Sequence, residues 1–100
     1  MNTITAEPTS VGEMLREEFL KPLNITQEQL AKAMGLSRKV VNQIVNDQRR
    51  LNLDEAVLLA GLFETDSDFW INVQAAHDRW EAQVMVKNHP VKPLMSMAFS

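Results

Sequence analysis

At 100 residues the chain is long enough for one hydrophobic core but too short for a second, so we expect a single domain. It has no cysteine, which excludes disulfide frameworks and thiolate metal sites and suits the cytoplasm, where we place the protein. The net charge is −3, but residues 26–50 carry a local charge of +3 and the rest of the chain sums to −6. The basic segment therefore favours a nucleic-acid partner.

No segment has the pattern of a secretory signal or of a membrane span. Residues 1–11 lack a basic stretch followed by an apolar run, and the longest apolar block is Ala56–Phe63. This block is far shorter than the about 20 residues that cross a bilayer, so we expect no membrane partner.

Capping residues and apolar spacing predict an all-α fold, and its first helix begins at Ser10. Glu13 stands three residues later and completes a capping box. Val11, Met14, Leu15 and Phe19 would line the inward face. We expect this helix to end near residue 21, because the ring of Pro22 forbids a further regular turn.

Two short helices follow. Thr26 and Gln29 form a second capping box, which opens a helix that runs to Met34 and stops at Gly35. Ser37 can cap the next helix, and residues 46 and 47 suit a left-handed exit from it.

Two longer helices complete the predicted set. Asn52 and Glu55 open a helix over Leu53–Phe63, and its nearly unbroken apolar content indicates burial from several sides. Ser67 can cap a fifth helix that reaches about Lys87. The predicted organisation is a flexible segment over 1–9, a domain over 10–87, and a tail over 88–100 that is frayed or docked on a partner.

The second and third helices have the spacing of a helix-turn-helix, which needs inward apolar positions, a small residue at the helix crossing and a flexible turn residue. Ala31 occupies the crossing and Gly35 the turn. The inward positions are Leu30, Met34, Leu36, Val41 and Ile44. This pattern predicts binding to double-stranded DNA.

The third helix is then the recognition helix, and its polar residues suit the major groove. Arg38 or Lys39 can donate to guanine, and Asn42 or Gln43 can pair with adenine. We expect Ser37 to meet a phosphate.

Three further residues are predicted to contact the DNA backbone. Gln27 lies at the start of the second helix, where a phosphate would also meet the helix dipole. Arg49 and Arg50 follow the recognition helix, and the alternative for both is solvated loop charge.

A helix-turn-helix usually binds as a two-fold dimer, because one module reads few base pairs. The candidate interface lies on the fifth helix, and its predicted residues are Trp70, Val73, Trp80 and Val84. The alternative for the two tryptophans is a place in the core of the monomer.

An enzyme is the contrasting class. His77 and His89 are separated by twelve positions without metal-ligand spacing, and the chain has no nucleophile motif or phosphate-binding loop. We expect no catalytic residue, metal or cofactor. A bundle that only binds other proteins is a third class, and it predicts no salt-dependent affinity for DNA.

Two segments, Leu15–Leu23 with Thr26-Gln27 and Asp68–Ala76, resemble the HigA-type antitoxins of the Xre helix-turn-helix superfamily. The resemblance covers about residues 10–82. It implies a five-helix, lambda-repressor-like homodimer that represses its own operon and neutralises a HigB-like toxin, a messenger RNA endonuclease. A solitary Xre regulator without a toxin remains the alternative.

Transferred to matching positions, the family's DNA-contact surface falls on residues already selected: Gln27, Ser37, Arg38, Lys39, Asn42 and Gln43. The chain departs from the family at Asp47, where glycine is common, which predicts a strained or differently shaped turn. The tail from Asn88 matches no part of the family pattern.

Overall fold

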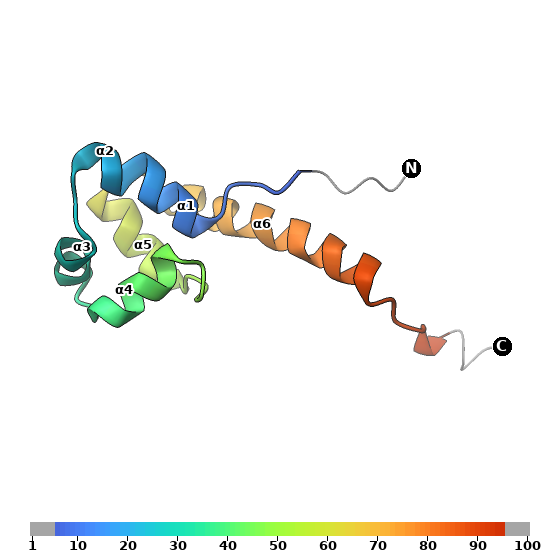
Figure 1. Ribbon diagram of the computed structural model, residues 1–100. Helices are drawn as coiled ribbons and strands as arrows, with labels where there is room; N and C mark the ends of the chain where they lie inside the picture. The colour runs from blue at the N-terminus through green and yellow to red at the C-terminus, as the bar shows by residue number, and fades with distance from the viewer. Residues whose placement is uncertain (1–5, 96–100) are drawn as a thin grey trace.

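The structure is a computed structural model that describes residues 6–95, and these form helices and connecting turns without a strand. Their order is α1 (Val11–Leu15), η1 (Arg16–Leu20), α2 (Lys21–Leu23), α3 (Gln27–Met34), α4 (Arg38–Val45), α5 (Leu53–Leu62) and α6 (Ser67–Asn88). The first three run on without a break and make one rod, so the five predicted helices are confirmed (Figure 1). Residues 1–5 of the predicted N-terminal segment and 96–100 of the predicted tail lie outside the described residues.

The sequence predicts that the first helix ends near residue 21, before Pro22, and this prediction is wrong. Pro22 lies inside the rod, and the helix continues to Leu23. The preceding segment η1 is a π-helix, in which the N–H of Lys21 donates to the carbonyl of Arg16, five residues earlier. This wider turn avoids the clash that a proline ring makes with the carbonyl four residues back in an α-helix. The rod instead ends at Asn24, which is left-handed with φ 58°.

One hydrophobic core joins the five helices. Its largest fully buried side chains are Trp70, Leu15, Ile44, Leu59, Val41 and Val45. The indole Nε1 of Trp70 donates a hydrogen bond to Thr65 Oγ1 at 2.8 Å, and its ring lies 5.1 Å from that of Phe19. The polar atom of this buried tryptophan is thus satisfied inside the monomer.

The prediction that α5 is buried from several sides is wrong. Only one face, with Ala56, Leu59 and Ala60, packs into the core. On the other face Leu53 is 72% exposed and Val57 is 60% exposed. Beyond Asp54 and Glu55 the helix is entirely apolar and lacks the polar stripe that marks a solvent-facing side, so its periodicity did not reveal which face is inside.

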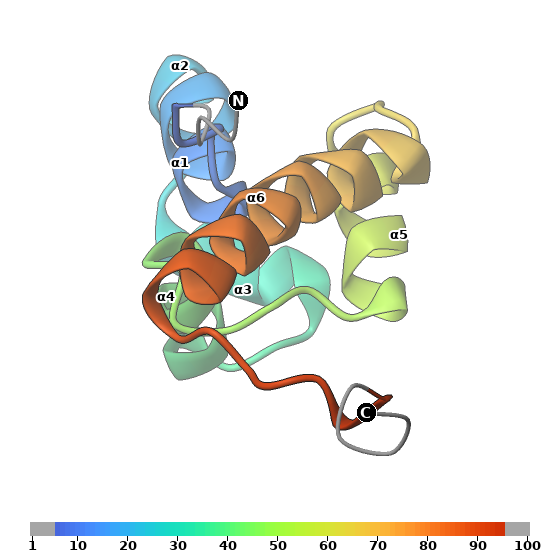
Figure 2. The same cartoon turned by 90° about the vertical axis from the view of Figure 1, so that its right-hand side faces the viewer.

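Helix α6 is a long rod that leaves the body of the molecule (Figure 1) and crosses over the other helices in the turned view (Figure 2). It gives the chain its elongated dimensions of 58 × 26 × 23 Å. Its N-cap is Asp66 and not the predicted Ser67, which is the first helical residue.

Candidate DNA-binding surface

The turn between α3 and α4 has the predicted helix-turn-helix geometry. Thr26 Oγ1 accepts from the N–H of Gln29 at 3.1 Å, and the Gln29 side chain accepts from the N–H of Thr26 at 2.9 Å. Gly35 is left-handed with φ 69°, a conformation that glycine adopts at little cost. Ser37 Oγ then accepts from the N–H of Val40 at 3.2 Å and caps α4. Each start and stop signal is confirmed.

The inward frame of the motif is also confirmed. The residues predicted to face inward lie in the core or pack against it: Leu30, Ala31, Met34, Leu36, Val41 and Ile44. Because this frame fixes α4 on its apolar side, the opposite side of α4 faces solvent.

The outward side of α4 carries two cations and two amides. Arg38 and Lys39 are exposed, and neither forms an ion pair with any residue between 6 and 95. Asn42 is exposed and Gln43 is half-buried. Unpaired cations are available to a ligand, because no internal carboxylate has to be displaced first.

Gln27 is joined to the recognition helix directly. Its Oε1 accepts a hydrogen bond from Asn42 Nδ2 at 3.1 Å. Sequence reasoning assigned Gln27 to phosphate and Asn42 to a base without connecting them, and the structure brings the two side chains together. This bond holds the Asn42 amide in one orientation.

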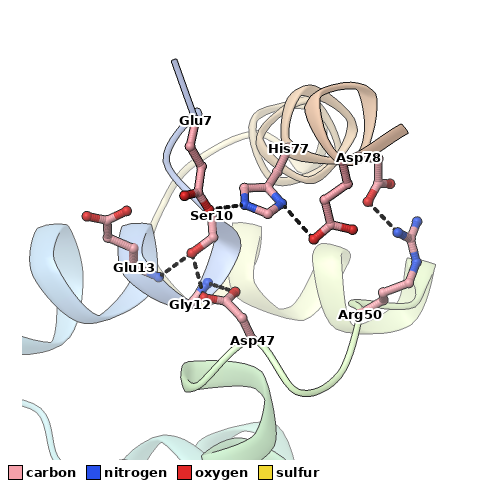
Figure 3. A network of polar contacts seen from close by, with 9 residues as sticks. Glu7, Ser10, Gly12, Glu13, Asp47, Arg50, His77 and Asp78 are labelled. Atoms are coloured by element: carbon pink, nitrogen blue, oxygen red, sulfur yellow. Dashed lines mark hydrogen bonds and ion pairs between the residues drawn. The ribbon is translucent and has the colours of Figure 1, made fainter. Parts of the chain in front are cut away.

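Asp47 links the exit of α4 to the start of α1 (Figure 3). It is left-handed with φ 56°, as predicted for this exit. Its carboxylate accepts from Ser10 Oγ at 2.6 Å and from the N–H of Gly12 at 2.8 Å. The family that the sequence resembles commonly has glycine at this position, which would allow the left-handed turn but could not bind the start of α1. Asp47 makes the turn and also caps α1. No local pattern signals the contact, since Ser10 and Asp47 are far apart in the sequence.

A close backbone approach strengthens the same junction. A Cβ atom added at Gly12 would lie 2.4 Å from the carbonyl oxygen of Val45, so glycine is required there. Arg16 Nη1 donates to that carbonyl at 2.8 Å. Together Gly12, Arg16 and Asp47 fix the C-terminal end of the recognition helix against α1.

Both predicted backbone anchors have intramolecular partners. Arg49 pairs with Glu55, whose side chain is only 4% exposed, and Arg50 pairs with Asp78 on α6. The hydrogen bond that Arg50 donates to the Asp78 carboxylate raises the pKa of Arg50 above its usual value. Neither arginine is a solvated loop charge without a partner, and their contacts with phosphate stay a prediction.

The loop after α4 is also tied to α6. Gln74 Nε2 donates to the carbonyl of Leu51 at 3.0 Å, and Gln74 Oε1 accepts from the N–H of Leu51 at 2.7 Å. This side-chain amide satisfies both backbone groups of a buried residue. It is a second structural residue that the sequence did not reveal.

His77 lies on α6 between two carboxylates. Its Nε2 lies 2.8 Å from Glu7 Oε2, and its Nδ1 lies 3.4 Å from Glu81 Oε1 (Figure 3). Within residues 6–95 no group of three or more potential ligand side chains is arranged for a metal ion. In the same range no helix is long and apolar enough to cross a membrane.

The predicted dimer residues on α6 do not form one exposed surface. Trp70 is fully buried in the monomer, so the prediction that it contacts a second chain is wrong. Val73 packs against the core, while Trp80 and Val84 are half-buried. A group of exposed apolar residues lies instead on the outward face of α5, which consists of Leu53, Val57, Leu58, Gly61 and Leu62. Other exposed apolar side chains lie on α6, at Ile71, Met85 and Val86.

Comparison with known proteins agrees with this geometry. A family model described as helix-turn-helix matches residues 16–70. An HTH-type transcriptional regulator of Haemophilus influenzae is 42% identical over 80 residues, 80% of this chain and 75% of the relative. Antitoxin HigA-1 of Vibrio cholerae is 38% identical over 96 residues, 94% of this chain and 90% of the relative.

A solved structure gives the same result. Pseudomonas aeruginosa antitoxin HigA with the higBA promoter has a TM-score of 0.77 and 36% identity, covering 87% of this chain and 98% of that one. These relatives are DNA-binding regulators and antitoxins, not enzymes. The chain therefore belongs to the helix-turn-helix family of Xre type and is a homologue of the HigA antitoxins over most of its length.

Proposed function

We propose that this protein has two roles. It is a sequence-specific repressor that binds the operator of its own operon, and it is also an antitoxin that neutralises a HigB-like messenger RNA endonuclease. The observation that carries the DNA-binding part is the outward side of α4, where the unpaired Arg38 and Lys39 lie beside the amides of Asn42 and Gln43. This combination of donors suits base edges better than it suits a protein surface.

Recognition follows from placing the N-terminal part of α4 in the major groove. Arg38 and Lys39 donate to guanine O6 and N7, and Gln43 pairs with adenine. The Ser37 hydroxyl already accepts from Val40, and its own proton remains to be donated to a phosphate. The bond between Gln27 and Asn42 orients the Asn42 amide before DNA arrives, which lowers the entropic cost of binding.

Operator binding by this chain is supported by the Pseudomonas aeruginosa HigA structure, which contains the higBA promoter. The antitoxin part is supported by the likeness to Vibrio cholerae HigA-1. The second candidate is a solitary transcriptional regulator without a toxin, since both an antitoxin and a solitary regulator use the same helix-turn-helix. An RNA endonuclease encoded beside this gene distinguishes the two.

The repressor acts as a homodimer, and we assign its interface to the outward face of α5. Four large apolar side chains gather there, and an added Cβ at Gly61 would meet no atom within 4 Å, so a second backbone can approach closely. Exposed apolar surface of this kind marks an interaction site. Two copies then read half-sites about 34–36 Å apart.

Titration of the gene's own promoter DNA at several salt concentrations tests the recognition surface. Arg38→Ala and Gln43→Ala should each weaken specific binding by about 1–3 kcal/mol while the helical content is unchanged. The control Lys87→Ala removes an exposed cation at the far end of α6 and should leave specific binding unchanged. Wild-type promoter affinity in both test variants would refute the assigned face.

A further inference from the structure

A second surface lies where η1 meets the turn between α5 and α6. The ring of Phe19 lies 4.9 Å from that of Phe63 and 6.2 Å from that of Phe69. All three rings are half-buried and rest on the core beside Trp70. Leu23, one helical turn beyond Phe19, is exposed. The molecule thus presents an aromatic cluster that its own chain covers incompletely.

Acidic residues are close to this cluster in the sequence. Between residues 51 and 76 the chain has five acidic side chains and no lysine or arginine. Of these, Glu64, Asp66 and Asp68 are exposed and stand within three sequence positions of Phe63 or Phe69, and the exposed Glu18 directly precedes Phe19. None of these four carboxylates forms an ion pair or a side-chain hydrogen bond with any residue between 6 and 95. Their charge is therefore available to a partner.

The monomer gains little from two of these acidic side chains. Glu64 is left-handed with φ 53°, where glycine would cost less, and Asp66 occupies the N-cap of α6 without making a capping hydrogen bond. Their presence agrees with a role outside the monomer.

This surface lies away from the recognition helix. The turn between α5 and α6 is at the upper side of the molecule and α4 is at the lower side in both Figure 1 and Figure 2, which share a vertical axis. A partner bound at the turn would leave α4 open to DNA.

We infer that the aromatic-acidic surface, made of Phe19, Phe63 and Phe69 with Glu18, Glu64, Asp66 and Asp68, is the docking site for the toxin. This inference rests on the proposed antitoxin function. An enzyme that binds RNA presents a basic surface to the phosphates, and that surface is complementary to these carboxylates. The same charges repel nucleic acid, and a second copy would bring two acidic surfaces together. Charge complementarity therefore selects a basic protein as the occupant.

Neutralising these charges without changing side-chain size tests the inference. The test variant is Glu18→Gln/Glu64→Gln/Asp66→Asn, in which asparagine remains a good N-cap residue. The control variant, Glu13→Gln/Glu28→Gln/Asp54→Asn, removes the same charge from exposed positions elsewhere. The binding probe is the endonuclease encoded by the neighbouring reading frame, measured at low and high salt together with inhibition of its RNA cleavage.

We expect the test variant to bind the endonuclease roughly tenfold to a hundredfold more weakly at low salt, mainly through a slower association rate. The difference should shrink at about 1 M salt, and the control variant should bind like the wild type. Promoter DNA should bind the test variant as tightly as the wild type and should form a ternary complex with the endonuclease.

The possible failures are distinguishable. If the wild type neither binds nor inhibits the neighbouring endonuclease, the antitoxin function itself is wrong. If the wild type inhibits it and the test variant does so equally well, the function stands and this surface is not the site. A change of oligomeric state in the test variant, seen by sedimentation, would show that a second copy occupies the surface and would overturn the inference.

Discussion

The helix-turn-helix, residues 26–50, and the region that follows it, residues 51–76, use apolar and charged side chains in opposite ways. The first buries its apolar residues and exposes unpaired cations on α4. The second exposes apolar residues on α5 and carboxylates around its turn, and it has no lysine or arginine. One region is suited to phosphate and bases and the other to protein partners, so one small core can present two kinds of surface.

The largest expected effect tests whether the exposed face of α5 is the interface of the proposed homodimer. Val57→Glu would place a charge in both halves of the proposed interface and should raise the dimer dissociation constant by at least about a hundredfold. Val84→Glu is the matched control on distal α6 and should leave the dimer intact. Sedimentation equilibrium measures both. The reverse pattern would assign the interface to α6, as the sequence predicts.

The next effect compares two helical glycines, one buried in the junction that fixes the recognition helix and one on the exposed face of α5. Gly12→Ala brings a Cβ within 2.4 Å of a backbone oxygen and should lower the free energy of unfolding by about 2–3 kcal/mol. Gly61→Ala makes the same chemical change on the open face of α5 and should stabilise the monomer by up to about 1 kcal/mol. Urea denaturation measures both. Equal effects would contradict the tight contact between α1 and α4.

The smallest effect separates the two arginines after the recognition helix. Arg49→Ala leaves the buried Glu55 without its ion-pair partner and should cost about 2 kcal/mol of stability, whereas Arg50→Ala breaks an exposed pair and should cost less than about 1 kcal/mol. Thermal unfolding of both variants measures the difference. If Arg49→Ala instead kept full stability and lowered the salt slope of DNA binding by about one unit, Arg49 would be a phosphate anchor.

The helix-turn-helix could be predicted from the sequence because its determinants are local. The capping box at Thr26, the turn at Gly35 and the cap at Ser37 each act within a few residues. The spacing of inward residues then fixes which side of α4 faces solvent. These short-range rules were sufficient for the fold and for the position of the proposed recognition residues.

The remaining features depend on contacts between distant parts of the chain. The bonds from Asp47 to Ser10 and from Gln74 to Leu51 join segments that no pattern connects. The sequence predicts a helix end at Pro22, but the preceding π-helix shifts the hydrogen bonds to partners five residues apart and the helix continues through the proline. The burial of Trp70 could not be predicted from the sequence, because tryptophans in a monomer core and in a dimer interface occur at the same helical spacing.

The junction of Gly12, Arg16 and Asp47 also bears on how an operator is accommodated. Since backbone and side-chain bonds hold the end of α4 against α1, tilting the recognition helix toward an imperfect half-site would break these contacts. Bending or twisting of the DNA is then the less costly adjustment. Operators with the same contacted bases but stiffer central base pairs should therefore be bound less tightly, and the geometry of the protein would select sequence at positions it never touches.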